Sequence, residues 1–312
     1  MKQVVVGGGP VGSGVALLLA NQGIDVALVT RSGSKIVHPL IKQLRGNAGD
    51  VDFLIGATQG AAVIYNCANP LYHRWPIDWP PIHKAMMATA ERTGAVLAMT
   101  DNFYSFTSSS SSPIFETCPM NATGQKGFTR AVMAKELLKA HAEGRLKATL
   151  ARASDFYGPT VHISHYGDRL IPNIVESKKV SVLGDLDQPH SLSYIKDVVR
   201  TLIAIGNDDR AWGKPWHVPN APAVSQRVAV TMLAEAAKRK VRIAETRKWK
   251  VISKSLTNPY DRELLEIWWM WTQPFVVDSS LTEKTFNLSA TPLEEAFADT
   301  IRWYQKENTR PQ

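Results

Sequence analysis

Apolar runs alternate with amphipathic stretches through the first half of the chain. Short apolar runs, each bounded by Gly, Asn or Asp, predict strands over 3–6, 25–29, 62–66, 95–99 and 147–151. The longer stretches between them predict helices over 11–21, 82–93 and 128–142. The first of these helices carries apolar residues at Val15, Leu18 and Leu19. Strands that alternate with helices of this length indicate an α/β fold with a doubly wound parallel sheet.

The alternation weakens after about residue 155, where Pro and Trp become more frequent. A strand is predicted over 180–183, and a helix over 196–205 that returns to the first domain. We therefore expect a first domain of residues 1–155 plus about 190–215, and a smaller C-terminal α/β lobe of about 156–189 plus 216–312. The serine run 108–112 predicts a flexible surface loop.

Two aromatic segments stand out. Residues 71–75 (LYHRW) follow a predicted strand, and we expect them either to line an apolar substrate pocket or to pack as a surface loop. Residues 264–271 contain Trp268, Trp269 and Trp271, and predict lobe core or a lid over the site. A dimer or membrane-facing patch is the alternative for this second segment.

Composition places the chain among ordinary globular proteins, with 44% hydrophobic and 21% charged residues. Cys67 and Cys118 are its only cysteines, too few for a disulfide framework, so a reducing cytoplasm is expected. The sequence shows neither a signal peptide nor an apolar run long enough to span a bilayer, so a soluble protein without a membrane partner is predicted.

The formal net charge is +8, and part of the excess lies in one segment. Such a basic run suits nucleic acid or an anionic membrane surface. No nucleic-acid-binding motif accompanies it, so we expect a solvated face and no nucleic-acid partner. The segment contains Lys238, Arg239, Lys240, Arg242, Arg247, Lys248 and Lys250.

A glycine motif follows the first predicted strand and opens the first helix. Gly7, Gly9 and Gly12 form G-x-G-x-x-G, with Pro10 and Val11 inside it. The first glycine permits a tight turn, the second lets a pyrophosphate approach the backbone, and the third allows close helix–strand packing. The free N–H groups and positive dipole end of the helix then face the phosphates. The motif predicts a dinucleotide site; a glycine-rich turn without a ligand is the alternative.

The end of the second strand indicates which dinucleotide binds. A site specific for NAD usually places Asp or Glu there, to accept hydrogen bonds from the ribose 2′-hydroxyl. This chain has Thr30 followed by Arg31, and a guanidinium suits a 2′-phosphate. Ser32 and Lys35 are placed to assist. NADP is therefore predicted in preference to NAD; stacking of Arg31 on the adenine, which either cofactor would allow, is the alternative.

Four segments resemble the NAD-dependent epimerase/dehydratase family, the extended short-chain dehydrogenases/reductases. They are VVVGGGPVG at 4–12, IYNCANP at 64–70, RASDFYGP at 152–159 and SYIKDV at 193–198. The resemblance implies a Rossmann domain whose parallel sheet has about seven strands, and a small C-terminal lobe that closes over the substrate. It also places Cys67, Ala68, Asn69 and Ser154 at the cofactor, and leaves a homodimer open because dimers are common in the family.

The catalytic segment departs from the family's Y-x-x-x-K pattern. Family enzymes use the Tyr as general acid/base and the Lys to lower its pKa and hold the nicotinamide ribose. Here Lys126 stands at the Tyr position and Arg130 at the Lys position, with Thr100 near the family's Ser/Thr. Arg130 would still bind a ribose hydroxyl. In a dry site beside Arg130, the pKa of Lys126 would fall, and the lysine would serve as proton donor.

Three alternatives to Lys126 as the proton donor remain. Lys126 would have no chemical role if it were a solvent-exposed residue at a helix start, and this is the simpler expectation. Tyr104 lies just after the Thr100 strand, and Tyr157 belongs to the Y-G-P segment. Either tyrosine is a candidate acid, although a buried tyrosine more often packs and hydrogen-bonds.

Several function classes are disfavoured. No H-E-x-x-H or C-x-x-C spacing indicates a metal site, and neither G-x-S-x-G nor G-K-[ST] is present. The main prediction is an NADP(H)-dependent oxidoreductase that transfers hydride to or from a carbonyl or related group of a small organic substrate. One alternative is a non-catalytic NADP(H) sensor, which the altered Y-x-x-x-K supports. The other is a sugar-nucleotide epimerase or dehydratase.

Overall fold

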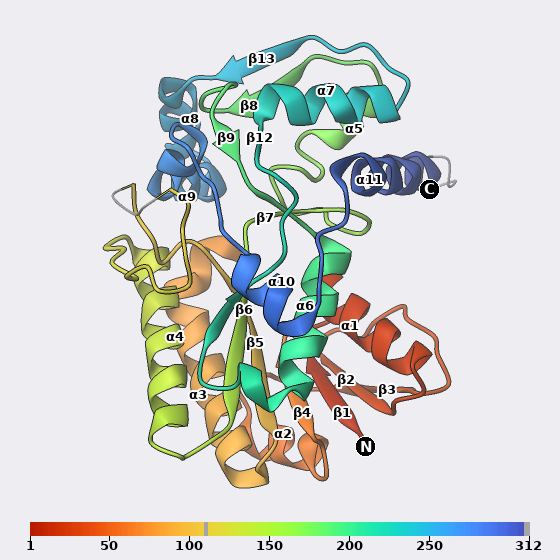
Figure 1. Ribbon diagram of the computed structural model, residues 1–312, viewed down its shortest axis with the longest axis vertical. Coiled ribbons are helices and arrows are strands. Elements are labelled where there is room, and N and C mark those ends of the chain that lie inside the picture. Colours follow the sequence, from red (N-terminus) through yellow and green to blue (C-terminus); the bar gives the residue numbers. More distant parts are fainter. Residues whose placement is uncertain (109–111, 309–312) are drawn as a thin grey trace. The chain divides into compact units, whose positions relative to one another are not determined.

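Two units make up the chain in the computed structural model, which describes residues 1–108 and 112–308 (Figure 1). Unit 1 comprises Met1–Phe106, Met120–Arg152 and Val198–His217, and unit 2 comprises Thr107–Pro119, Ala153–Asp197 and Val218–Gln312. The predicted loop at 108–112 includes 109–111, which lie outside the described residues.

A parallel sheet forms the centre of unit 1. Its order is β11-β6-β5-β4-β1-β2-β3, which gives seven strands among the described residues. Within this sheet, every strand pair with an assigned register is parallel. The predicted doubly wound α/β class is therefore confirmed. The strands are β1 (Gln3–Val6), β2 (Val26–Thr30), β3 (Ile41–Arg45), β4 (Val63–Asn66), β5 (Val96–Asn102), β6 (Ala148–Ala153) and β11 (Pro215–His217).

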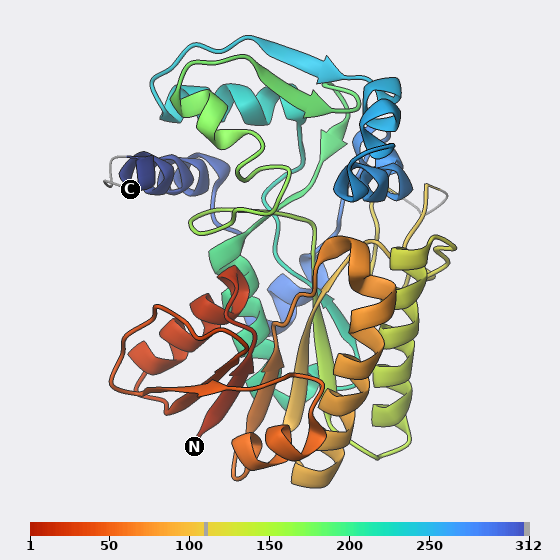
Figure 2. The ribbon, with the colours of Figure 1, turned by 180° about the vertical axis from the view of Figure 1, so that it is seen from behind.

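Helices cover both faces of this sheet (Figure 2). One face carries α2 (Val51–Thr58), α3 (Trp75–Thr93) and α4 (Gln125–Ala142), whose apolar residues share one core cluster with the strands. The other face carries α1 (Pro10–Asn21) and α6 (Ile195–Asn207). There Gly14 and Val199 bring α1 and α6 into close contact, because a Cβ on Gly14 would lie 2.6 Å from the Val199 side chain. Short 3-10 turns cover Tyr72–Arg74 and Asp209–Ala211.

The structure extends the predicted elements in two places. The helix predicted over 82–93 begins at Trp75, and Pro80 and Pro81 lie inside it. Prolines normally end helices, because they lack an N–H and clash with the preceding turn, so they concealed this start. The helix predicted over 128–142 begins at Gln125, which brings Lys126 into its first turn. The strand β3 and the helix α2 were not predicted.

Unit 2 contains small two-stranded sheets, which pair β10 with β7, β12 with β9, and β13 with β8. Its strands are β7 (Asp155–Tyr157), β8 (Val180–Leu183), β9 (Pro189–His190), β10 (Leu192–Tyr194), β12 (Val224–Ser225) and β13 (Ile243–Thr246). Its helices are α5 (Ile171–Val175), α7 (Gln226–Ala236), α8 (Lys248–Ser255), α9 (Pro259–Glu266), α10 (Ser280–Phe286) and α11 (Leu293–Asn308), with a 3-10 turn at Trp268–Trp271.

The tryptophan segment of unit 2 belongs to its core. Trp268 and Trp271 are buried, and their rings meet edge to face at 6.3 Å. The prediction of lobe core for 264–271 is confirmed, and an exposed dimer or membrane-facing patch at these two tryptophans is excluded. Across the described residues, none of the helices is both long and apolar enough to cross a membrane.

Candidate functional site

The glycine turn between β1 and α1 has the geometry of a ligand cradle. Gly7 has a φ of +111°, and a Cβ there would lie 2.4 Å from the Cys67 carbonyl oxygen. A Cβ on Gly12 would lie 1.9 Å from the Gly7 carbonyl oxygen, so both positions exclude a side chain. Gly9 differs, because no atom lies within 4 Å of its Cβ position. The turn is packed from behind and open at Gly9, where a pyrophosphate would approach.

This turn lies at the point where the strand order of the sheet reverses. The chain runs from β1 outward through β2 and β3, and then returns to β4 on the other side of β1. Ligands of open α/β sheets bind at such a point, beyond the carboxyl ends of the strands. Gly9 is the N-cap of α1 and no side chain caps the helix, so the first-turn N–H groups are open to a phosphate. The residues present therefore fit a dinucleotide.

Cys67 closes the floor of this region. The thiol is buried, and burial raises its pKa to about 12, so it stays protonated. The Thr100 hydroxyl at the end of β5 lies 3.8 Å from the Cys67 sulfur. The structure thus brings Thr100, Cys67 and Gly7 together. Ala68 and Asn69 continue the chain beside them, and the Ala68 amide donates to the Asn66 side chain.

The end of β2 forms a compact turn with basic side chains around it. The buried Thr30 accepts a hydrogen bond from the Gly33 amide through its hydroxyl. Arg31, Ser32 and Lys35 are exposed. The guanidinium of Arg45, at the end of the neighbouring β3, lies within 3.3–3.7 Å of the Cβ position of Gly33. Arg45 was missed from the sequence because β3 was not predicted.

Lys126 lies in an aromatic environment inside unit 1. It is 0% exposed, so the expectation of a solvent-exposed lysine is wrong. Its ammonium lies 4.2 Å from the centroid of the Tyr72 ring and 6.0 Å from that of Tyr104. Gly127 makes this packing possible, because a Cβ there would lie 2.3 Å from the Tyr104 carbonyl oxygen. The ammonium is held by ring faces, a contact that favours a cation.

Arg130 lies one turn further along α4, in a buried ion cluster. It is 2% exposed, and its guanidinium donates to Asp101 at 2.6 and 3.0 Å. Arg152 from β6 donates to the other Asp101 oxygen at 3.0 Å. Burial alone would raise the pKa of Asp101, but the charges and hydrogen bonds of the two arginines outweigh it and hold the pKa below its ordinary value.

This cluster fixes the end of β5. Arg130 donates a 2.7 Å hydrogen bond to the Thr100 carbonyl and stacks over Trp79 at 4.9 Å. The geometry gives Arg130 a structural task in holding Thr100. Its predicted role at the nicotinamide ribose stays a prediction. No sequence pattern pairs these residues, because they come from three separate elements.

Tyr157 and Ser154 belong to unit 2, whereas the other predicted site residues belong to unit 1. Tyr157 is buried and packs on Tyr194 and Phe297, with ring centroids 5.4 and 5.0 Å away. Burial raises the pKa of Tyr157 above its ordinary value, so proton release from it is disfavoured. Ser154 is also buried, and its amide donates to the Ser193 hydroxyl. The role of Tyr157 as an acid and that of Ser154 at the cofactor stay predictions.

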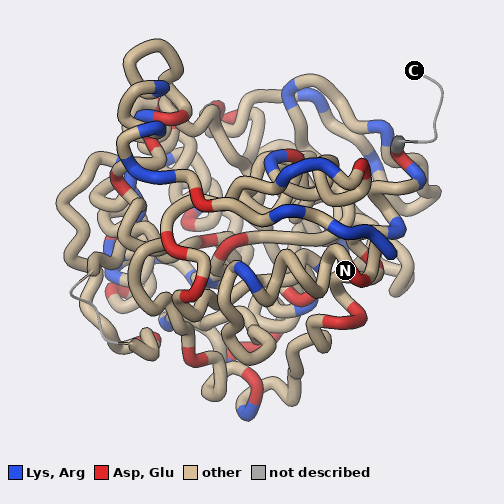
Figure 3. The backbone as a smooth tube through the Cα atoms, turned by 90° about the horizontal axis from the view of Figure 1, so that it is seen from above, with Lys and Arg blue, Asp and Glu red and all other residues tan. Residues whose placement is uncertain are grey.

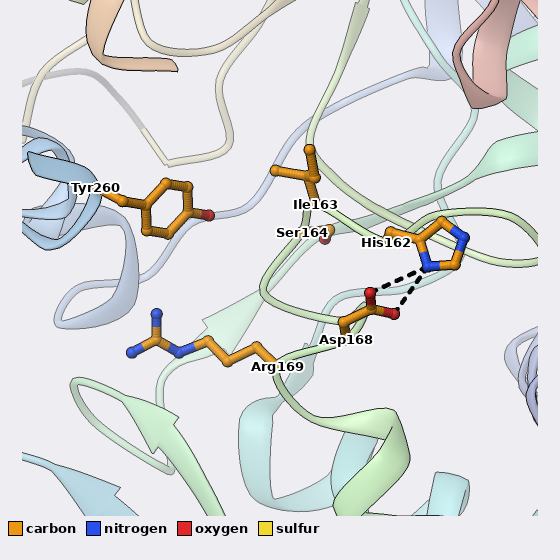
Figure 4. A pocket seen from close by; sticks show the side chains of 6 residues that line it. All are labelled: His162, Ile163, Ser164, Asp168, Arg169 and Tyr260. Atoms are coloured by element: carbon orange, nitrogen blue, oxygen red, sulfur yellow. Dashed lines mark hydrogen bonds and ion pairs between the residues drawn. The ribbon is translucent and has the colours of Figure 1, made fainter. Parts of the chain in front are cut away.

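Two adjoining hollows open on unit 2, with volumes of about 360 and 390 Å³. They share Arg169 and Tyr260. In Figure 4 the Tyr260 hydroxyl and the Ile163 side chain point toward one another across the first hollow, and Arg169 extends along it. The second hollow adds two lysines and several amide and hydroxyl groups; its further lining residues are Asn173, Lys179, Ser181, Thr246, Lys254, Asn258 and Asp261.

Cationic side chains outnumber carboxylates around the hollows, with Arg169, Lys179 and Lys254 against Asp168 and Asp261. Arg169, Lys179 and Lys254 form no ion pair in the part of the chain that the structure describes. Asp168 is already engaged, because it accepts hydrogen bonds from the Tyr304 hydroxyl at 2.9 Å and lies 3.0 Å from the His162 ring. Three cationic side chains with neighbouring amides and hydroxyls can hold an anionic group such as a phosphate.

Comparison with known proteins places this geometry in a family. Residues 3–218 match the model of the NAD dependent epimerase/dehydratase family. The chain therefore belongs to that family, and the family resemblance seen in the sequence is confirmed. No curated protein sequence matches it.

Solved structures with the same fold include an epimerase and two enzymes that are named for nucleotide-linked sugars. The epimerase Mth375 from Methanothermobacter thermautotrophicus is 14% identical with a TM-score of 0.81, and the match covers 98% of this chain and 92% of that one. UDP-glucuronic acid 4-epimerase from Bacillus cereus, in complex with NAD, is 14% identical (TM-score 0.78, 98% and 99% covered). dTDP-glucose 4,6-dehydratase from Bacillus anthracis, also with NAD, is 15% identical (TM-score 0.79, 99% and 97% covered).

Proposed function

We propose that this chain is an NAD(P)-dependent enzyme that acts on a sugar nucleotide or a similar phosphate-bearing substrate. The observation that carries dinucleotide binding is the open Cβ position of Gly9 between the closed positions of Gly7 and Gly12. The bound nicotinamide supplies hydride transfer. Unit 1 would hold the dinucleotide and unit 2 the substrate, in keeping with the division expected from the sequence.

The hollows of unit 2 support the substrate class. A sugar nucleotide carries a diphosphate, and Arg169, Lys179 and Lys254 present three cationic groups to one. Tyr260 adds a ring beside them. The epimerase and dehydratase structures with the same fold act on nucleotide-linked sugars, which favours this class over a neutral carbonyl compound.

The acid/base group we propose is Tyr104, with Lys126 as its partner. Oxidation of a secondary alcohol to a ketone releases a hydride from carbon and a proton from oxygen; Tyr104, ionised beforehand, would accept that proton and return it in the reverse step. Tyr104 is half-buried, whereas Lys126 is fully buried beside its ring. A positive charge near a phenol favours the ionised form. The family's Tyr–Lys pair would thus be rebuilt from other positions.

A second candidate is an NADP(H)-dependent reductase, which Arg31 and Arg45 favour. Two guanidinium groups at the ends of β2 and β3 suit a 2′-phosphate, although the UDP-glucuronic acid 4-epimerase and the dTDP-glucose 4,6-dehydratase named above hold NAD. The two candidates differ in cofactor balance. An epimerase or dehydratase returns the hydride it removes, whereas a reductase consumes one NADPH for each product.

The experiment is a product assay on UDP- and dTDP-sugars with the dinucleotide in trace amount, followed by mass spectrometry and NMR. Epimerised or dehydrated sugar with no net change in dinucleotide would support the proposal. Stoichiometric NADPH oxidation by carbonyl compounds would favour the reductase instead. Tight dinucleotide binding without turnover of any substrate would favour the non-catalytic sensor.

A further inference from the structure

Helix α8 presents large apolar side chains to solvent. Trp249 is 61% exposed, Ile252 46% and Leu256, directly after the helix, 78%. They are spaced three and four residues apart, so they share one side of the helix. A neighbouring side of the helix is anchored, because Val251 and Ser255 are buried and α8 packs against α9. The exposed apolar stripe therefore does not serve the packing of α8 within unit 2.

The segment around this stripe is strongly basic. Residues 238–256 contain eight Lys and Arg residues and one acidic residue, Glu245, and all eight basic residues are exposed. Nearly all of the chain's net charge of +8 thus lies in this segment. Lys250 lies 5.6 Å from the Trp249 ring. Figure 3, which views the molecule from the side where β13 lies in Figure 1, shows Lys and Arg recurring across this face.

We propose that residues 238–256, the α8 surface, dock on an anionic phospholipid bilayer. A folded helix with a tryptophan and aliphatic stripe beside lysines lies in the interface plane, with its apolar side among the acyl chains and its lysines at the phosphates. The surface lies on the membrane and does not span it, in keeping with the absence of a spanning helix among the described residues.

The apolar stripe decides between the partners that a basic surface can attract. Nucleic acid offers phosphates but no apolar phase for three exposed hydrophobic side chains, and an ordered duplex would leave them in water. A bilayer takes both features at once, because apolar burial and attraction to anionic headgroups add. Tryptophan is moreover enriched at membrane interfaces, where its ring is apolar and its N–H stays hydrated.

The test is flotation of the full chain with two kinds of vesicle, phosphatidylcholine alone and phosphatidylcholine with about 30 mol% phosphatidylserine. Wild type should float with the anionic vesicles only, and less so at high salt. The triple variant Trp249→Ser/Ile252→Ser/Leu256→Ser should bind the anionic vesicles at least tenfold more weakly, because each CH₂ group no longer buried costs about 0.8 kcal/mol. Lys248→Gln/Lys250→Gln should lower the partition coefficient about fivefold per lysine.

The matched control is Val37→Ser/Leu281→Ser, which removes exposed apolar side chains outside the α8 surface and should float like wild type. Circular dichroism melting checks that each variant is folded. The proposal is overturned if wild type ignores anionic vesicles, if the triple variant floats as well as wild type, or if the protein binds duplex DNA at the same salt but not vesicles. None of these outcomes depends on dinucleotide binding or turnover.

Discussion

Gly9→Ala should separate ligand binding from folding. The Cβ position of Gly9 has no atom within 4 Å, and its φ of −73° suits alanine. Alanine is a poorer N-cap than glycine by some tenths of a kcal/mol, while the loss of freedom in the unfolded chain stabilises by about 0.4–1 kcal/mol. These effects oppose one another, so the free energy of unfolding should change by less than about 1 kcal/mol.

Dinucleotide affinity should fall in the same variant. The added methyl group would occupy the space through which the pyrophosphate reaches the backbone of the turn. Overpacking of a tight contact costs about 1–3 kcal/mol, which corresponds to a roughly five- to 150-fold weaker Kd. Gly12→Ala should behave differently, because its Cβ would lie 1.9 Å from the Gly7 carbonyl oxygen and would disturb the fold itself.

For each variant, the assay combines a fluorescence titration, with NADPH as the ligand, and a urea unfolding curve. Gly56→Ala is the control, because Gly56 lies in α2 with an equally open Cβ position and no part in the proposed site. It should leave the Kd unchanged. A folded Gly9→Ala variant that binds the dinucleotide as tightly as wild type would refute the reasoning.

Three further outcomes follow from the site. Asp101→Asn should lower the free energy of unfolding by about 3–5 kcal/mol, because two buried guanidinium groups lose their counter-charge. Because the pKa of Asp101 is lowered in the folded state, the wild type should lose this stabilisation only as the pH falls below about 4. Urea unfolding curves measured across this pH range should show no such loss in the variant. Tyr104→Phe should abolish turnover with the dinucleotide Kd unchanged, and Lys126→Met should lower kcat and shift the pH–rate profile upward; unchanged turnover in either would contradict the proposed pair. Arg31→Ala should weaken NADPH about tenfold and leave NADH unaffected in parallel titrations, and an equal loss for both would point to adenine stacking.

Local patterns predicted the centre of the fold. The turn at Gly7, Gly9 and Gly12 was predicted from its own residues and the strand before it, so a few consecutive positions were enough. The strands β1, β4 and β6 are buried along their whole length and mostly apolar, so their pattern is equally direct. The strand β3 escaped because it is largely exposed and carries Lys42, Gln43 and Arg45 instead of an apolar run.

The environment of the catalytic segment could not be predicted in the same way. Lys126 is buried because Tyr72, from a 3-10 turn far earlier in the chain, covers its ammonium. The Arg130–Asp101–Arg152 cluster likewise joins α4, β5 and β6. A single sequence records the charge of each residue but not which distant side chain will cover or neutralise it, so a lysine at a helix start looked exposed.

The most direct test of the central claim is a fluorescence titration of the wild-type chain with NADPH and with NADH, with Gly9→Ala measured beside it. We expect saturable binding of at least one of the two nucleotides by wild type, and markedly weaker binding by the folded variant. A wild-type chain that is folded but binds neither nucleotide would contradict the assignment of the glycine turn as a dinucleotide site, and with it the proposed function.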